Sequence, residues 1–525
     1  MDFAVKVRAR PSHDHRRIRV EPMKFENRAG AAFRVQSDQK ITWLAAVARL
    51  HNGPVAQLTK HACPAHCADA VAIECSWRRR ADDSDAHFRR IIALAPPYNR
   101  GVFSSGQIRS MLIDARERTL ELVSDLADEQ LIVREIDIIN PPVWELGHIA
   151  WFHEKWELRH LRGEAAGHPH ADGFWDSAAV SHHSRWELPL PPRALTLQYM
   201  QQVLDRALER LPADTLTGEE AYFHWLGIMH EDMHGEAFAY TRQTLGYPPP
   251  AGWLPARASP ISESGNGDVQ IQGGTYRLGA LPPGKFVFDN EKWAHAVQLR
   301  PFAIARCAVT NGQFADFVND GGYRRREWWS DEGWEWRQRE AAGHPVYWIP
   351  QENGKWLHRF YDRILPLPAS HPVIHVNWYE AEAFCRCAGR RLPTEAEWEL
   401  ASSGMNKSAY PWGEDAPAPQ QAHLDACSLG CVPVSDRAAG DSALGARQMI
   451  GNVWEWTATD FLPYPGFVID PYKEYSQPWF GRERKVLRGG CWVTRSRLIR
   501  NTWRNYFPKD RRDIFAGFRT CAETE

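Results

Sequence analysis

The sequence predicts a multidomain protein with an α part and an α+β part, in which a four-helix bundle precedes a domain of short strands and turns. The chain has 525 residues, 43% of them hydrophobic and 24% charged, which is enough for about two to four domains. Helical periodicity is followed by a linker rich in Pro, Gly and Ser, and then by short strands. The predicted segments are a poorly ordered stretch or extension at 1–98, the bundle at 99–246, the linker at 247–267 and the C-terminal domain at 268–525.

Charge and composition favour a small-molecule partner. The formal net charge is −2, with 63 Lys and Arg against 65 Asp and Glu, so neither nucleic acid nor an anionic membrane is an expected partner. No apolar run approaches the roughly 18 residues that a membrane span needs, and the N-terminus has no apolar signal segment. Ten cysteines without dense, even spacing indicate reduced thiols. We therefore expect a cytoplasmic protein; composition does not predict its oligomeric state.

The first predicted segment is rich in Arg, His and Ala and lacks sustained periodicity. It contains a short group of metal-binding residue types, His61, Cys63, His66 and Cys67. Because their spacing matches no common zinc class and no second half follows, we expect no metal there.

Four segments with helical periodicity predict the helices of the bundle. Serines precede the first segment and could cap it, and Asn140 with two prolines begins the second. The segments cover residues 103–126, 140–163, 195–211 and 217–246.

The fourth segment contains His230-Glu231-Asp232-Met233-His234, which reads as the H-E-x-x-H signature of zinc peptidases. The two histidines are one helical turn apart on a stripe of mostly apolar or small residues, so both are predicted to point inward. Buried histidines need either hydrogen-bond partners or a metal ion. The spacing by itself leaves both interpretations open.

A third histidine on a facing helix completes a ligand set. His148 lies on the second predicted helix, where Trp151 and Phe152 would share its inward side. The remaining bundle histidines lie on less apolar faces or in loops and are expected at the surface; they are His153, His160, His182, His183 and His224. We therefore predict that His148, His230 and His234 bind one metal ion.

Five sequence blocks of the C-terminal part carry a resemblance to a known fold. They are "HPVIHVNWYEAEAFCRCAGRRLPTEAEWELA" (371–401), "YPWGED" (410–415), "GNVWEWT" (451–457), "VLRGGCW" (486–492) and "AGFR" (516–519). In this order they resemble the formylglycine-generating-enzyme, or sulfatase-modifying-factor, domain, which is a C-type-lectin-like α+β fold. With a preceding bundle that carries "PPVWELGH" and "HEDMH", residues 103–522 resemble the ergothioneine-pathway sulfoxide synthases, whose bundle is DinB-like, and their relatives, the ovothiol-pathway enzymes and selenoneine synthases.

This resemblance implies a non-haem Fe(II) enzyme that uses O₂ to join a sulfur or selenium donor to the imidazole C2 carbon of hercynine. It implies that His148, His230 and His234 are the iron ligands. Three neutral imidazoles suit Fe(II) and leave positions for O₂ and a soft donor, whereas zinc cannot activate O₂. The H-E-x-x-H match is then incidental, and Glu231 is either a helix residue or a residue that supports the ligands, rather than a general base.

Other function classes explain less of the sequence. In a zinc peptidase the third ligand usually comes from downstream of the helix, and the large C-terminal domain would have no role. A formylglycine-generating oxidase works through a cysteine pair, but no cysteine follows Cys491 within the next turns, and Cys385 and Cys387 fall in a helical segment. A non-catalytic lectin-like binding module does not explain three inward histidines.

Departures from the family pattern bear on the donor. The family stretch "RNWDYP" corresponds here to "RNYFP", so Asn505 is kept while Tyr506 and Phe507 replace a Trp and the acid that would meet a donor amine. Met233 replaces a glutamine, and Arg185 is the one arginine where users of γ-glutamyl-cysteine place two. These changes favour a selenosugar donor, as in a selenoneine synthase. A sulfoxide synthase with a drifted motif, which uses cysteine or γ-glutamyl-cysteine, is the alternative.

The predicted substrate-binding residues are Asn505, Tyr506, Phe507, Met233, Arg185 and Arg511. Asn505 would hold the carboxylate of hercynine or a bridging water, while the trimethylammonium group would seek aromatic faces. The family also needs a proton donor near the O₂ position, commonly a tyrosine. Tyr464 and Tyr506 are the predicted catalytic residues, and Tyr472 is a further candidate.

Overall fold

The computed structural model describes residues 103–216, 218–255, 267–282, 286–352 and 354–523, together with the backbone of six strands before residue 98. The chain divides into two compact units, Met1–Pro97 and Tyr98–Glu525. The second unit contains both the predicted bundle and the predicted C-terminal domain.

The first unit contains short strands that the sequence analysis does not predict. They are β1 Phe3–Lys6, β2 Ala31–Ser37, β3 Lys40–Ala46, β4 Ala56–Leu58, β5 Ile73–Trp77 and β6 Arg90–Ile92. One sheet has the order β4-β1-β5-β6, and β2 pairs with β3 in an antiparallel ribbon. The metal-binding residue types His61, Cys63, His66 and Cys67 lie outside the described residues.

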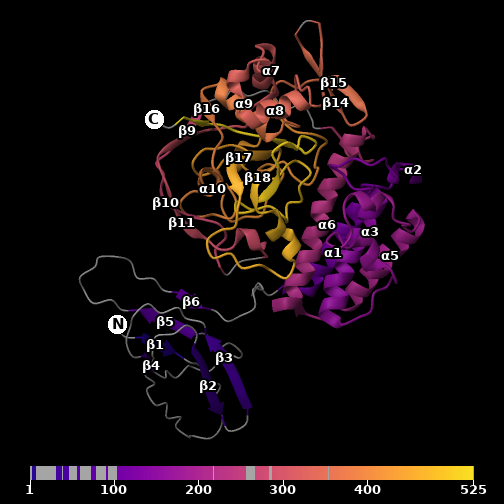
Figure 1. Cartoon of the computed structure of the whole chain (residues 1–525), viewed down its shortest axis with the longest axis vertical. Helices are drawn as coiled ribbons and strands as arrows, with labels where there is room; N and C mark the ends of the chain where they lie inside the picture. Colours follow the sequence, from indigo (N-terminus) through magenta and orange to yellow (C-terminus); the bar gives the residue numbers. More distant parts are fainter. Residues whose placement is uncertain are drawn as a thin grey trace, which may run out of the picture. The chain divides into compact units, whose positions relative to one another are not determined.

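Four long helices form the bundle, and Figure 1 shows them running alongside one another. They are α1 Ser105–Glu121, α3 Pro142–His153, α5 Arg193–Glu209 and α6 Gly218–Leu245, which correspond to the four predicted segments. Ser104 caps α1, because its hydroxyl accepts the backbone N–H of Gln107 at 3.4 Å. A short strand, β7 Phe103–Ser104, precedes α1, and the connections between the long helices contain α2 Asp128–Leu131, α4 Ala171–Trp175 and β8 Thr215–Leu216.

The helix α3 continues into a π-helix, Glu154–His160. Pi-helical segments are rare in proteins, and those that do occur often lie at functional sites. Here the segment places Glu154 and Glu157 in the interior of the bundle, where both carboxylates are buried. The interior of the bundle is therefore charged as well as apolar.

The C-terminal domain is an α+β structure of short elements. Its main sheets have the orders β19-β18-β17-β20 and β16-β21-β12-β9, and β13-β14-β15 and β10-β11 form smaller sheets. The strands are β9 Asp268–Ile271, β10 Gly274–Leu278, β11 His295–Leu299, β12 Phe302–Ala305, β13 Trp348–Pro350, β14 Trp356–Phe360, β15 Arg363–Pro366, β16 Arg390–Arg391, β17 Trp454–Phe461, β18 Gly481–Arg488, β19 Asn505–Pro508, β20 Ala516–Gly517 and β21 Cys521–Ala522. The helices are α7 Asn311–Asn319, α8 Asp331–Arg339, α9 Trp378–Cys387 and α10 Glu395–Ser403.

The bundle and the C-terminal domain share a hydrophobic core. One cluster of buried side chains includes Trp144 and Phe223 of the bundle together with Trp454 and Trp492 of the C-terminal domain. Glu236 on α6 accepts the indole N–H of Trp454 at 2.6 Å. The helix α6 therefore packs directly against the C-terminal domain. Over the described ranges, no helix is long and apolar enough to cross a membrane.

Candidate metal centre

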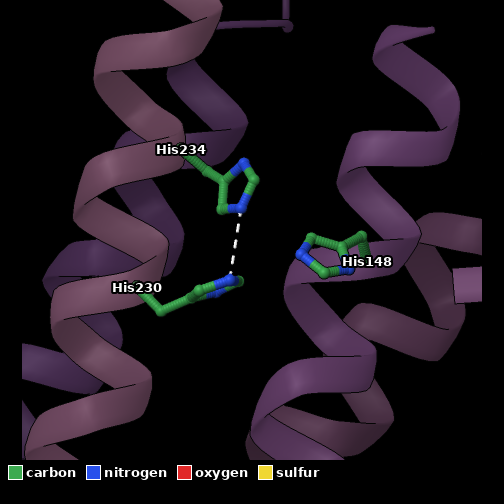
Figure 2. Close-up of side chains that lie close together, drawn as sticks. All are labelled: His148, His230 and His234. Atoms are coloured by element: carbon green, nitrogen blue, oxygen red, sulfur yellow. Dashed lines mark hydrogen bonds between the residues drawn. The ribbon is translucent and has the colours of Figure 1, made fainter. Parts of the chain in front are cut away.

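Three histidines converge at one point inside the bundle. His148 lies on α3 and faces His230 and His234 on α6, as Figure 2 shows. One ring nitrogen from each histidine lies within 4.8 Å of the other two, and the Nε2 atoms of His230 and His234 are 3.3 Å apart. The structure thus brings together the three residues that the sequence analysis predicts as one set.

The hydrogen bonds of the Nδ1 atoms show which ring nitrogens are available to a metal ion. Nδ1 of His148 is 2.7 Å from the carbonyl oxygen of Trp175, and Nδ1 of His234 is 2.6 Å from Oε1 of Glu145. Since a carbonyl and a carboxylate can only accept, both Nδ1 atoms carry the proton and both Nε2 atoms present a lone pair. Nδ1 of His230 has no hydrogen-bond partner among the described residues.

The charge state of the rings suits metal binding. Burial, followed by the neighbouring His234, lowers the pKa of His148 and of His230 well below the usual value, so both imidazoles are neutral at pH 7. The Nε2 atoms of His230 and His234 are at hydrogen-bond distance, and His230 is the donor in the tautomer that carries its proton on Nε2. Imidazole nitrogens are suitable ligands for a divalent transition-metal ion, and the Nδ1 contacts leave Nε2 of His148 and of His234 available to bind one.

Aromatic rings hold the histidines in place. The Phe152 ring stacks on His230 at a centroid distance of 3.6 Å, and Trp144 stacks on His148 at 4.8 Å. Tyr472 of the C-terminal domain lies edge-on to Phe152 at 4.8 Å and to His230 at 6.1 Å. These rings restrict rotation of the imidazoles and limit the access of water.

Arg185 lies one layer outside the histidines. Its guanidinium stacks over Trp144 at 4.0 Å and donates to Oδ1 of Asn140 at 2.5 Å. Burial lowers the pKa of Arg185 to about 10. Within the described part of the chain no carboxylate forms an ion pair with it, and its Nε has no partner. The carboxylate of Glu145 attracts this charge and offsets part of the effect of burial on the pKa. A partly buried guanidinium with an unpaired Nε is suited to bind a substrate anion.

Met233 and Tyr506 meet at the same tyrosine. The hydroxyl of Tyr475 donates to Sδ of Met233 at 3.8 Å, and the hydroxyl of Tyr506 donates to the carbonyl of Tyr475. The Tyr506 ring also stacks on Phe461 at 3.8 Å. These contacts place two predicted substrate residues beside the segment that carries Tyr472.

The other predicted substrate residues are held by neighbours in the C-terminal domain. Oδ1 of Asn505 accepts the backbone N–H of the next residue at 2.8 Å. The guanidinium of Arg511 lies over the ring of Phe507 at 5.1 Å and donates to Asp513 at 2.6 Å. Neither Asn505, Phe507 nor Arg511 has a described contact with the three histidines.

Tyr464 lies in a different core from the histidines. It belongs to a buried cluster formed by the strands and α10 of the C-terminal domain. Its hydroxyl donates to Glu395 at 3.3 Å, and Arg504 lies 4.1 Å from its ring centre. Of the three tyrosines considered in the sequence analysis, Tyr472 is the one whose ring contacts the histidine set.

A buried network that sequence reasoning missed lies behind His230. Glu231 accepts hydrogen bonds from Arg116 at 2.9 Å and from the hydroxyl of Thr119 at 2.8 Å. His153 bridges two carboxylates, with Nε2 at 2.9 Å from Glu231 and Nδ1 at 2.5 Å from Glu157. The network joins α1, α3 and α6 at the level of the metal site.

The predicted surface positions of two histidines are therefore wrong. His153 and His224 are 2% and 1% exposed, and both bind the carboxylate of Glu157. They are buried because a charged partner compensates the loss of water. The spacing of four residues between His153 and Glu157 was the available signal. The other three histidines that were predicted to lie at the surface are half-buried or exposed. They are His160, His182 and His183.

Two family models match the second unit. The Sulfatase-modifying factor enzyme 1-like domain matches residues 256–524, and the DinB superfamily matches residues 111–237. The predicted fold class, a DinB-like bundle followed by a formylglycine-generating-enzyme-like domain, is confirmed.

Curated relatives match the same arrangement. A protein named hercynine oxygenase from Mycobacterium tuberculosis is 38% identical over 426 residues, covering 79% of this chain and 98% of its own. The protein of the same name from Mycolicibacterium thermoresistibile is 36% identical over 437 residues, covering 80% of this chain and 95% of its own. The formylglycine-generating enzyme of Thermomonospora curvata is 36% identical over 233 residues but covers 38% of this chain and 74% of its own.

Proposed function

The chain belongs to the family of the hercynine oxygenases, and on this basis we propose that it is a non-haem Fe(II) enzyme that acts on hercynine with O₂. We propose further that it forms a C–Se bond between the imidazole C2 carbon of hercynine and a selenosugar. An ergothioneine-pathway sulfoxide synthase that uses cysteine or γ-glutamyl-cysteine is the second candidate. The observation that carries the proposal is the convergence of three imidazoles at one point inside the bundle, with one ring nitrogen of each within 4.8 Å of the others.

In this proposal His148, His230 and His234 hold the iron through their Nε2 atoms. When bound, Fe(II) would supply the redox chemistry that O₂ requires and an affinity for a soft sulfur or selenium donor. The side chains around the site orient the imidazoles, and Phe152 and Trp144 shield them from water. The limits of the iron-binding bundle, 99–246, and of the domain that covers it, 268–525, are part of the proposal.

The environment of Glu231, the residue after His230, supports an iron oxygenase over a zinc peptidase. A general base must reach the water that it activates. Glu231 is 1% exposed and is engaged by Arg116, Thr119 and His153. These partners hold its carboxylate in the interhelical network, so it is suited to a structural role.

Hercynine carries a carboxylate and a trimethylammonium group, and the chain offers partners for both. Arg185 is proposed to bind the carboxylate, because its guanidinium is partly buried and its Nε has no hydrogen-bond partner among the described residues. Asn505 is proposed to add a hydrogen bond from Nδ2, since its Oδ1 is already occupied. The faces of Tyr472 and Tyr475 suit the cation, which gains on the order of 2 kcal/mol over a desolvated ring.

Tyr472 is the proposed proton donor. Burial raises the pKa of its hydroxyl, so its Oη keeps the proton at neutral pH and can deliver it to a reacting atom. Tyr464 and Tyr506 direct their hydroxyls to Glu395 and to the carbonyl of Tyr475. These bonds favour positioning roles for the two tyrosines that the sequence analysis proposes as catalytic.

A neutral sulfur or selenium donor is proposed because Met233 and Phe507 replace the polar and acidic residues that would contact a charged donor. Met233 contacts the hydroxyl of Tyr475 through its sulfur and offers no amide, and Phe507 offers a ring in place of an acid. A sugar ring can pack on such surfaces. A selenolate is also ionised at neutral pH, whereas an ordinary thiol with a pKa of about 8.5 must first lose its proton.

A competition assay tests the donor. Aerobic enzyme with Fe(II) and hercynine receives equal concentrations of selenosugar, thiosugar, cysteine and γ-glutamyl-cysteine, and the products are identified by mass. We expect the selenium product to predominate. Predominant sulfoxide from either amino-acid thiol would refute the selenium assignment and leave the iron and hercynine assignments standing.

The metal assignment has its own test. We expect His234→Ala to lose bound iron and turnover, while His160→Ala, which changes a histidine whose side chain is 42% exposed, keeps both. Iron content is measured on the purified, folded variants. Stoichiometric iron in His234→Ala would show that the ligand set is wrong.

A further inference from the structure

One carboxylate contacts a histidine of the set directly. Glu145 lies on α3 one turn before His148 and is 1% exposed. Its Oε1 accepts the Nδ1 proton of His234 at 2.6 Å. A single turn of α3 therefore carries one histidine of the set and the group that orients another histidine on α6.

The three histidines differ in what lies behind them. Nδ1 of His148 faces the carbonyl of Trp175 at 2.7 Å, which is a neutral acceptor, and Nδ1 of His230 has no partner among the described residues. His234 alone in the set has a carboxylate behind its ring. A carboxylate makes the opposite nitrogen a better electron donor than a neutral partner does.

Glu145 is buried and forms no ion pair with Lys or Arg in the described structure, although its charge attracts the Arg185 guanidinium at longer range. It lies in the first turn of α3, where the helix dipole favours a negative charge. Its Oε2 has no hydrogen-bond partner among the residues that the structure describes. Such a group is costly to bury, and a cation bound by the histidines would offset that cost.

We propose that Glu145 is a positioning residue of the metal centre, which holds Nε2 of His234 toward the ion and supplies a buried negative charge behind it. This inference rests on the proposed function, because it requires that the three histidines bind a metal.

Co(II) is the probe that separates this role from a merely structural one. Its visible absorption bands report ligand strength and geometry, and its affinity is measured by anaerobic titration of the full chain. We expect Glu145→Ala to weaken Co(II) binding about 10-fold to 100-fold and to change the bands. Glu145→Gln keeps an acceptor for Nδ1 but not the charge, so we expect a smaller loss of affinity with a similar geometry.

Glu157→Gln is the matched control. Glu157 also binds buried histidines, at 2.5 Å and 2.7 Å, but neither of them belongs to the metal set. We expect this variant to lower the Tm while it keeps the wild-type Co(II) affinity and bands. Equal losses of affinity in Glu157→Gln and Glu145→Gln would mean that Glu145 acts through general stability, which overturns the inference.

A further variant distinguishes failure of this inference from failure of the proposed centre. If His234→Ala binds Co(II) as the wild type does, the metal centre itself is wrong. If His234→Ala loses Co(II) while folded Glu145→Ala and Glu145→Gln bind it with wild-type affinity and bands, the centre stands and the role of Glu145 is refuted.

Discussion

Oε1 of Glu231 accepts a hydrogen bond from Nε of Arg116 at 2.9 Å, and the side chains of Glu231 and Arg116 are 1% and 3% exposed. This pair joins α6 to α1 immediately beside His230, one of the three histidines proposed to bind the metal. Its partners make Glu231 part of the framework that supports the histidines, which agrees with the prediction that it is not a general base.

Removing the charge of Glu231 should therefore affect stability more than chemistry. We expect Glu231→Gln to lose about 3 kcal/mol of unfolding free energy, because breaking a buried pair leaves an uncompensated charge. Urea unfolding and specific activity of the folded fraction are measured together. Glu219→Gln, which changes an exposed pair on the same helix, should have little effect. Abolished activity in a fully stable Glu231→Gln protein would instead indicate a catalytic base.

Two tyrosines offer a paired test of proton transfer. Tyr472→Phe should lower kcat by about 10²-fold to 10⁴-fold, which is the usual contribution of a positioned acid, with metal binding unchanged. Tyr464→Phe should keep kcat and lose about 1 kcal/mol of stability, since it gives up one hydrogen bond to Glu395. Steady-state kinetics and Tm values decide between them, and the opposite pattern would restore Tyr464 as the catalytic candidate.

Substrate binding can be tested at Asn505. We expect Asn505→Ala to raise the KM for hercynine about fivefold, the equivalent of one hydrogen bond of about 1 kcal/mol, with a smaller change in kcat. Initial rates over a range of hercynine concentrations measure it. An unchanged KM would remove Asn505 from the substrate site.

The pH dependence of stability should report the bridge formed by His153. Burial alone would lower its pKa, but Glu157 and Glu231 raise it from 6.5 to about 9. A group whose pKa is higher in the folded state stabilises the fold fully below its unfolded pKa and loses that contribution as the pH rises through the folded value. We therefore expect the urea midpoint to fall between about pH 6.5 and pH 9. His153→Gln should remove this fall while it lowers stability at pH 6.

Much of the architecture could be predicted from local patterns. The helices α1, α3, α5 and α6 follow from apolar spacing and end signals, since those periodicities are long enough to read. The position of His148 opposite His230 and His234 also follows, because the apolar stripes show which faces meet. By contrast, β1–β6 are three to seven residues long and give no sustained pattern.

The sequence by itself determined the fold class, the family and the three histidines, because these depend on periodicity and on motifs that are contiguous in the chain. Only the tertiary structure decided which side chains form hydrogen bonds with the histidines and glutamates of those motifs. The predicted surface residue His153 became the bridge between Glu157 and Glu231, and Glu145 became the acceptor for His234. It also placed Tyr472, rather than Tyr464, beside His230. The physical reason is that a buried polar group takes the nearest compensating partner in space, and a partner 89 residues away along the chain, as Glu145 is from His234, leaves no local signal.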